Sequence, residues 1–191
     1  MFKSSVAARL ECSTRGYHRQ VSAPVEQETD VEWLSDEQQQ AWRALAALFT
    51  TVPAALDAQL RRDAGLNGFE YQVLAALSEA PGRAVVLTDL AEAAQGSLSR
   101  LSHAVTRLEK AGLVERRTCP GTGSRRTEAR LTEAGWTRIQ QVVPGHVREV
   151  RRLVVDALTP EQLLALGEAA RLVTAAARAR VAEVCTGADA C

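Results

Sequence analysis

Apolar residues recur at helical spacing near both ends of the chain. The first stripe has spacings of three, four, three and four residues, and it comprises Trp42, Leu45, Phe49, Val52 and Leu56. This period predicts a long helix. Ser35 and Gln38 have the spacing of a capping box, in which two side chains satisfy backbone N–H groups of the first turn. The helix should therefore begin at Ser35.

The same kind of signal marks three further helices. Asn67 and Glu70 form a second box, and the helix that they open should bury Phe69, Val73, Leu74 and Leu77. One long helix is predicted from Thr132. Another should begin at a third box, Thr159 with Gln162, and carry an apolar stripe as far as Val181.

Between these helices, residues 87–132 combine two short helices with a hairpin. A helix capped by Thr88 leads to a turn at Gln95 and Gly96, and Ser97 caps the next helix. Strands are expected over residues 85–87, 113–118 and 126–131, with a loop that contains Pro120, Gly121 and Gly123. This order is that of a winged helix-turn-helix, which places one helix in the DNA major groove. The predicted fold class is mainly α, with a winged helix-turn-helix lobe on a helical dimerisation frame.

The second of the two short helices is the predicted recognition helix. At 100° per residue, Leu101, Ala104, Val105 and Leu108 cluster on one side, which should pack into the core. The opposite side and its edges are polar, and they carry Ser97, Ser99, Arg100, Ser102, His103, Thr106 and Arg107. Hydroxyl, imidazole and guanidinium groups suit contacts with base edges and phosphates. The alternative interpretation is that these residues form a polar helix face that contacts only solvent.

The hairpin favours the DNA-binding interpretation because it is rich in arginine. Arg116, Arg117, Arg125, Arg126 and Arg130 lie within 15 residues, and residues 97–130 hold eight Lys/Arg against three Asp/Glu. Residues 31–80 have the opposite balance, with three Lys/Arg against seven Asp/Glu. The net charge of the whole chain is zero. A local basic wing neutralises phosphates and reaches the neighbouring minor groove. Double-stranded DNA is the expected partner.

Composition bounds the class of protein. The 191 residues are 46% hydrophobic and 4% aromatic, which favours a helix-rich globular protein. There is no run of 18 apolar residues and no signal-peptide pattern, so we expect no membrane partner and a cytoplasmic location. The expected organisation is a disordered tail over 1–30, a single domain over 31–185 and a tail over 186–191. Within the domain, the dimerisation helices are 35–63 and 133–182, and the winged lobe is 67–132.

Chemistry beyond binding has little support in the sequence. No Ser-His-Asp order, paired catalytic carboxylates, phosphate loop or metal-ligand spacing is present, so we expect no enzyme activity, no cofactor and no metal. Of the four cysteines, Cys119 lies among the wing arginines, which favour its thiolate form. It is a redox candidate, although an exposed cysteine is more often passive. His146, Trp42, Tyr71 and Trp136 are candidates to line a ligand cleft, with core packing as the alternative; the ligand is unknown.

Several segments resemble the MarR family of bacterial regulators. The segment LSRLSHAVTRLEKAGLVERR, followed by a glycine-rich loop and RLTEAGW, resembles the family's reading lobe. The segments WLSDEQQQAWRAL, LDAQLRRDAGLNGFEYQVLAAL and DALTPEQLLAL resemble one large branch of it, so the resemblance covers residues 32–180. It implies an obligate homodimer that reads a pseudo-palindromic operator, and repression relieved by a small ligand or by oxidation.

Two positions depart from the family pattern. Gly123 stands where the wing usually has an aspartate that aims an arginine, and Leu98 begins the recognition helix where a polar or basic residue is usual. Both bear on the strength and sequence preference of DNA binding. An alternative function is therefore a winged-helix protein-interaction module with weakened or lost DNA binding.

The apolar stripes at both ends of the chain also favour a dimer on physical grounds. The lobe is too small to cover both stripes, and pairing with a second copy would bury them.

Overall fold

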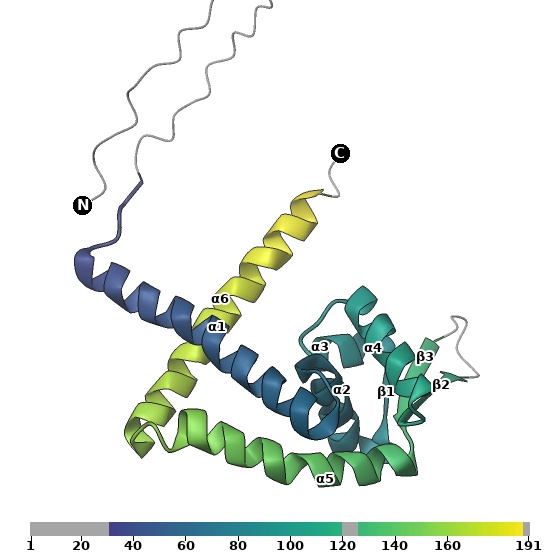
Figure 1. Ribbon diagram of the computed structural model, residues 1–191. Helices are drawn as coiled ribbons and strands as arrows, with labels where there is room; N and C mark the ends of the chain where they lie inside the picture. The colour runs from purple at the N-terminus through teal and green to yellow at the C-terminus, as the bar shows by residue number, and fades with distance from the viewer. Residues whose placement is uncertain (1–30, 120–125, 189–191) are drawn as a thin grey trace, which may run out of the picture.

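The computed structural model describes residues 31–119 and 126–188, with side chains over 31–118 and 126–181. The described chain is mainly helical and has one three-stranded sheet. Two long helices, α1 (Asp36–Ala64) and α5 (Glu133–Val150), run from a compact lobe, and α6 (Pro160–Ala188) follows α5 (Figure 1). The predicted fold class, a winged helix-turn-helix lobe on a helical frame, is confirmed.

All three predicted capping boxes are present. The backbone N–H groups of Ser35, Asn67 and Thr159 donate to the side chains of Gln38, Glu70 and Gln162 at 2.8, 3.0 and 2.9 Å. Each pair is completed by the reciprocal bond back to the capping residue. Local side-chain chemistry thus sets where α1, α2 (Gly68–Glu79) and α6 begin. At its other end α1 stops at Gly65, whose φ of 64° is open to glycine at little cost.

The lobe contains α2 (Gly68–Glu79), α3 (Leu87–Ala93) and α4 (Leu98–Lys110), with strands β1 (Ala84–Val86), β2 (Val114–Cys119) and β3 (Arg126–Leu131). The antiparallel sheet has the order β1-β3-β2, so the short strand after α2 does pair with the hairpin. In the register, Ala129 of β3 lies opposite Val85 on one side and Arg116 on the other.

The start of α3 differs from the prediction. The helix begins at Leu87 directly after β1, and Val86 occupies the cap position without a side-chain bond. The Thr88 hydroxyl donates to Asp89 Oδ1 at 2.9 Å instead of capping the helix. The strand runs straight into the helix, so no separate cap residue lies between them.

The core lies inside the lobe and at the root of the frame. It includes the predicted inner faces of α2 and α4, and it is completed by Leu60, Leu90, Ala129, Leu131 and Ile139. Gly96, in the turn before α4, is needed for close packing, because a Cβ there would lie 2.4 Å from the Phe69 ring. The turn therefore sets the position of the recognition helix against α2.

The frame continues beyond α5 through a π-helical turn (Arg151–Val155) to α6. Helix α6 runs to Ala188, so part of the segment predicted as a C-terminal tail is helical. The predicted tail over 1–30 lies outside the described residues.

Large apolar side chains remain exposed on the frame of the single chain. On α1, Trp42 and Phe49 are 56% and 55% exposed, and on α6, Leu164 and Leu172 are 73% and 65% exposed. These side chains belong to the predicted apolar helices at the two ends of the chain, and the lobe does not cover them.

Candidate nucleic-acid interface

Helix α4 presents the predicted polar face to solvent. Leu101, Ala104, Val105 and Leu108 are buried, while Ser99, Ser102, His103 and Thr106 are exposed. The Ser97 hydroxyl accepts from the Arg100 N–H at 3.2 Å and so caps the helix. The side of α4 away from the core is therefore free to meet a groove.

One edge of α4 is fastened to the wing by Arg116. The guanidinium pairs with Glu109 and donates from Nη2 to the Ser102 carbonyl at 2.9 Å and to Thr106 Oγ1 at 3.0 Å. The Arg116 backbone N–H also donates to Glu109 Oε1 at 2.9 Å. Arg116, predicted as a DNA contact, thus joins β2 to the recognition helix with its guanidinium largely satisfied.

The other edge of α4 is fastened to α2. Arg107 Nε donates to Glu70 Oε1 at 2.5 Å, and the Glu70 side chain is only 9% exposed. Glu70 also caps α2 through its second oxygen, so one carboxylate fixes both helices. Two turns earlier on this edge, the Arg100 guanidinium lies 4.2 Å from the centre of the Phe69 ring, a cation–π contact. Glu70, Glu109 and Phe69 were not predicted as parts of the site; the seven-residue spacing of Arg100 and Arg107 on one helix edge was the available signal.

The wing is only partly described. Arg117 pairs with Glu115 at 2.6 Å, and Arg126 is exposed at the start of β3. Arg125, Gly123 and the Cys119 side chain lie outside the described residues. Among the predicted DNA-contact arginines that the structure describes, Arg100 and Arg126 have no carboxylate partner, so each brings an unneutralised positive charge to the interface.

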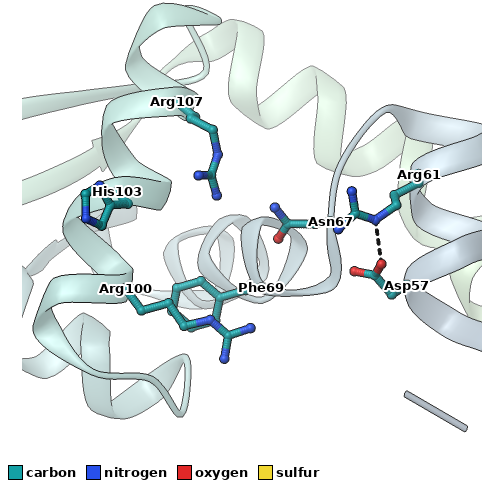
Figure 2. Close-up of a pocket in the computed structure, with 7 residues that line it drawn as sticks. All are labelled: Asp57, Arg61, Asn67, Phe69, Arg100, His103 and Arg107. Carbon is teal, nitrogen blue, oxygen red and sulfur yellow. Dashed lines mark hydrogen bonds and ion pairs between the residues drawn. The ribbon is translucent and has the colours of Figure 1, made fainter. Parts of the chain in front are cut away.

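A pocket opens beside the Arg100–Arg107 edge of α4. Its volume is about 340 Å³, and its lining comes from α1, α2 and α4: Asp57, Arg61, Asn67, Phe69, Arg100, His103 and Arg107. Figure 2 shows the guanidinium groups of Arg61 and Arg107 on the two sides of Asn67, and that of Arg100 over the Phe69 ring. The pocket brings three of the predicted recognition-helix residues together with Arg61 and Asn67, which the sequence did not single out as site residues.

Comparisons with known proteins show the family to which the chain belongs. The sequence profile of the MarR family matches residues 64–123. Sco3205 from Streptomyces coelicolor, a MarR family transcriptional regulator with a crystal structure in complex with DNA, is 44% identical, with a TM-score of 0.73. The match covers 76% of this chain and 91% of Sco3205. The chain belongs to the MarR family of transcriptional regulators.

Other MarR regulators share the architecture. AbsC, also from Streptomyces coelicolor, is 37% identical over 78% of this chain and 99% of its own, with a TM-score of 0.72. BpsR of Bordetella bronchiseptica, whose DNA binding is regulated by 6-hydroxynicotinic acid, is 20% identical over 71% of this chain and 98% of its own. Its TM-score of 0.62 shows a shared fold alone. A comparison with curated proteins gives no match.

In this MarR chain, the predicted cleft residues are not gathered in one place. Tyr71 and His146 are in contact, with ring centres 4.3 Å apart. Trp136 stacks under Arg83 at 4.1 Å and packs against the core, while Trp42 lies exposed on the outer half of α1. Core packing thus describes Trp136, and only Tyr71 and His146 share a site.

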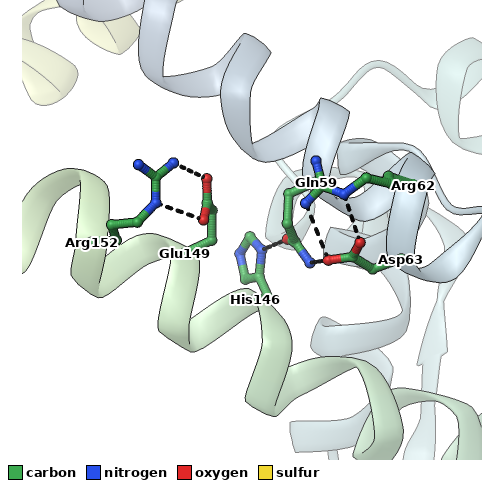
Figure 3. Close-up of polar contacts among 6 residues, drawn as sticks. All are labelled: Gln59, Arg62, Asp63, His146, Glu149 and Arg152. Atoms are coloured by element: carbon green, nitrogen blue, oxygen red, sulfur yellow. Dashed lines mark hydrogen bonds and ion pairs between the residues drawn. The ribbon is translucent and has the colours of Figure 1, made fainter.

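Tyr71 and His146 lie where the lobe meets the frame. His146 Nδ1 is 3.3 Å from Gln59 Oε1, and the buried Gln59 donates to Asp63 at 2.9 Å (Figure 3). Burial lowers the pKa of His146 and raises that of Tyr71. Beside them, Glu149 pairs with Arg152 at 2.6 Å, and this bond lowers the pKa of Glu149. The junction of α1, α2 and α5 is therefore a polar bridge between lobe and frame.

Neither a membrane span nor a metal cluster is found among the described residues. No helix in this part of the chain is both long and apolar enough to cross a membrane. No group of three or more His, Cys, Asp or Glu side chains within residues 31–118 and 126–181 is arranged to hold a metal ion.

Proposed function

We propose that this MarR family regulator binds a pseudo-palindromic DNA operator as a homodimer and represses transcription until a small ligand or an oxidant releases it. The observation that carries the proposal is the exposed polar face of α4, held in place by Arg116 on one edge and Arg107 on the other. A helix fixed on both edges keeps its side chains at defined positions in a groove. The crystal structure of the 44% identical Sco3205 with DNA supports this role.

Five of the predicted contacts would meet DNA directly in this scheme. Ser99, Ser102 and His103 face the major groove, and Arg126 with Arg125 extends to the backbone and minor groove. The homodimer would cover the apolar side chains of α1 and α6, and its two lobes would meet successive major grooves about 34 Å apart. Release requires that the effector favours a different lobe separation.

The first experiment measures binding of the purified protein to DNA from its own genomic neighbourhood at two salt concentrations. Arg126→Glu is expected to abolish selective binding because it reverses an unneutralised charge of the wing. Arg43→Glu, an exposed charge reversal on α1, is the matched control and should bind as wild type. A folded wild-type protein without selective binding would contradict the proposal.

Oxidative release is tested in the same assay. Peroxide treatment should weaken operator binding in the wild type and not in Cys119→Ser. Equal gel shifts before and after treatment would remove the oxidant from the proposal and leave the small ligand.

A second candidate function is a protein-interaction module. Leu98 is 53% exposed at the start of α4, and Arg107, Arg116 and Arg117 are each paired with a carboxylate, which weakens the attraction for phosphates. In that case Arg126→Glu would leave partner binding largely intact, and no DNA sequence would be preferred.

A further inference from the structure

The pocket beside α4 has a positive charge that its own carboxylates do not cancel. Arg61, Arg100 and Arg107 line it, while Asp57 and Glu70 hold two of these three guanidinium groups. We call this site the α1–α2–α4 basic pocket. These five groups leave one net positive charge.

The two paired arginines are held in a way that leaves donors for a ligand. Arg61 uses Nε to bind Asp57 Oδ2 at 2.5 Å, and Arg107 uses Nε to bind Glu70 Oε1 at the same distance. Within the described chain, the terminal nitrogens of both groups make no hydrogen bond. Both side chains are open to solvent, at 64% and 56% exposure. Guanidinium groups fixed at one edge are prepared to bind an oxyanion with the other.

The start of α2 does not itself provide the anion site. The Asn67 N–H donates to Glu70, the Gly68 N–H to Asp57, and the Glu70 N–H to the Asn67 side chain. These bonds saturate most of the free N–H groups of the first turn. Side chains therefore carry the recognition, and the Asn67 amide nitrogen adds a neutral donor.

We propose that the α1–α2–α4 basic pocket binds a backbone phosphate of the DNA beside the major groove that α4 enters. This inference rests on the proposed function. Arg100 and Arg107 lie on the edge of α4, adjacent to the exposed face of Ser99 and His103, so the pocket continues the DNA-facing surface towards α1. A helix seated in the major groove has a phosphate strand along each edge, and the wing arginines serve the opposite edge. Arg61 thus extends the DNA contact from the lobe to the frame.

Two substitutions of the Arg61–Asp57 pair test the proposal by the sign of their effects. Arg61→Ala should weaken binding to all DNA sequences and lower the salt slope by about 0.9 per pocket, or about 1.8 for a dimer. Asp57→Asn should strengthen binding, because it removes a negative charge and keeps an oxygen that can accept from Gly68. Both variants break the same ion pair, so a purely structural role predicts weaker binding from both.

Operators with a single neutral methylphosphonate locate the phosphate. At one position on each half-site, the modification should weaken wild-type binding. For each phosphate that is neutralised, the loss of affinity should be about 3.5-fold larger at 50 mM salt than at 200 mM salt. At that position the modification should weaken Arg61→Ala binding less than it weakens wild-type binding, because Arg100 and Arg107 still face the phosphate. Selective wild-type binding with an Arg61→Ala affinity and slope unchanged would overturn the phosphate contact and leave the proposed function standing. Absence of selective binding by the wild type would instead contradict the proposed function.

Discussion

At the scale of single residues, the partner of each arginine decides what it can do at the interface. Glu109 holds Arg116 against α4, so Arg116 acts mainly by positioning the recognition helix, whereas Arg107 is oriented by Glu70 through Nε and keeps its terminal nitrogens for a phosphate. Arg100 rests on an aromatic ring, which leaves its charge unneutralised. An ion pair in the free protein reduces the gain from a phosphate. The electrostatic attraction for DNA should therefore depend most on Arg100 and on the unpaired Arg126.

The same reasoning gives a pH dependence at His146. Burial disfavours the imidazolium and lowers the pKa below its ordinary 6.5, so below pH 6.5 the unfolded chain takes up a proton that the folded chain resists. The free energy of unfolding should fall as pH drops from 6.5 towards the lowered pKa. His146 is only partly buried, so the loss is a fraction of the ~1.4 kcal/mol that one pKa unit represents.

Urea unfolding of wild type and His146→Gln at one protein concentration measures this effect. The difference in unfolding free energy between the two proteins should change as pH falls from about 7.5 to about 5, with the wild type losing stability relative to the variant. Asp63 and Glu149, neighbours with lowered pKa values, lose their contribution only at more acidic pH, as the pH falls through those values. A difference that stays constant over this range would show that His146 does not titrate differently in the folded state.

At the scale of elements, the sequence predicted those features that depend on residues close together in the chain. The three capping boxes and the buried face of α4 follow from residues within a few turns of each other, and the structure contains them all. The partner of Arg107 is 37 residues away on α2, and Arg61 approaches α4 only when α1 packs on α2. Helical periodicity carries no information on such contacts. The pocket could therefore not be predicted, although Arg100 and His103 were singled out.

The junction between the wing and α5 offers a test at this scale. A Cβ on Gly135 would lie 2.1 Å from the Leu113 carbonyl oxygen and 2.7 Å from Leu131 Cδ1. Because the first obstacle is backbone, Gly135→Ala should destabilise the fold by about 1–3 kcal/mol. Gly145→Ala is the control in the same helix: its nearest neighbouring atom is 3.6 Å away, and alanine there should be neutral or stabilising by up to about 1 kcal/mol. Equal melting temperatures for the two variants would show that the junction yields without strain.

At the scale of the whole molecule, the apolar side chains of the frame decide between a monomer and a dimer. If the chain is a monomer, Leu172 stays 65% exposed, and Leu172→Gln should change stability by less than about 0.5 kcal/mol. If two copies bury the apolar side chains of α1 and α6 against each other, each leucine removed takes away about 1.5–3 kcal/mol, and symmetry counts it twice. Leu172→Gln should then raise the dimer Kd by at least about 100-fold.

Sedimentation equilibrium at micromolar concentration distinguishes these cases, and Leu98→Gln provides the matched control. Leu98 is also a half-exposed leucine, but it lies at the start of α4, the DNA-facing helix, so its substitution should leave self-association unchanged. Its DNA preference should change, because an apolar side chain in the major groove contacts thymine methyl groups. A wild-type monomer would contradict the homodimer and, with it, simultaneous reading of two half-sites. A dimer that Leu172→Gln dissociates would show that the frame closes on a second copy, since only then does a substitution on α6 change both association and operator affinity.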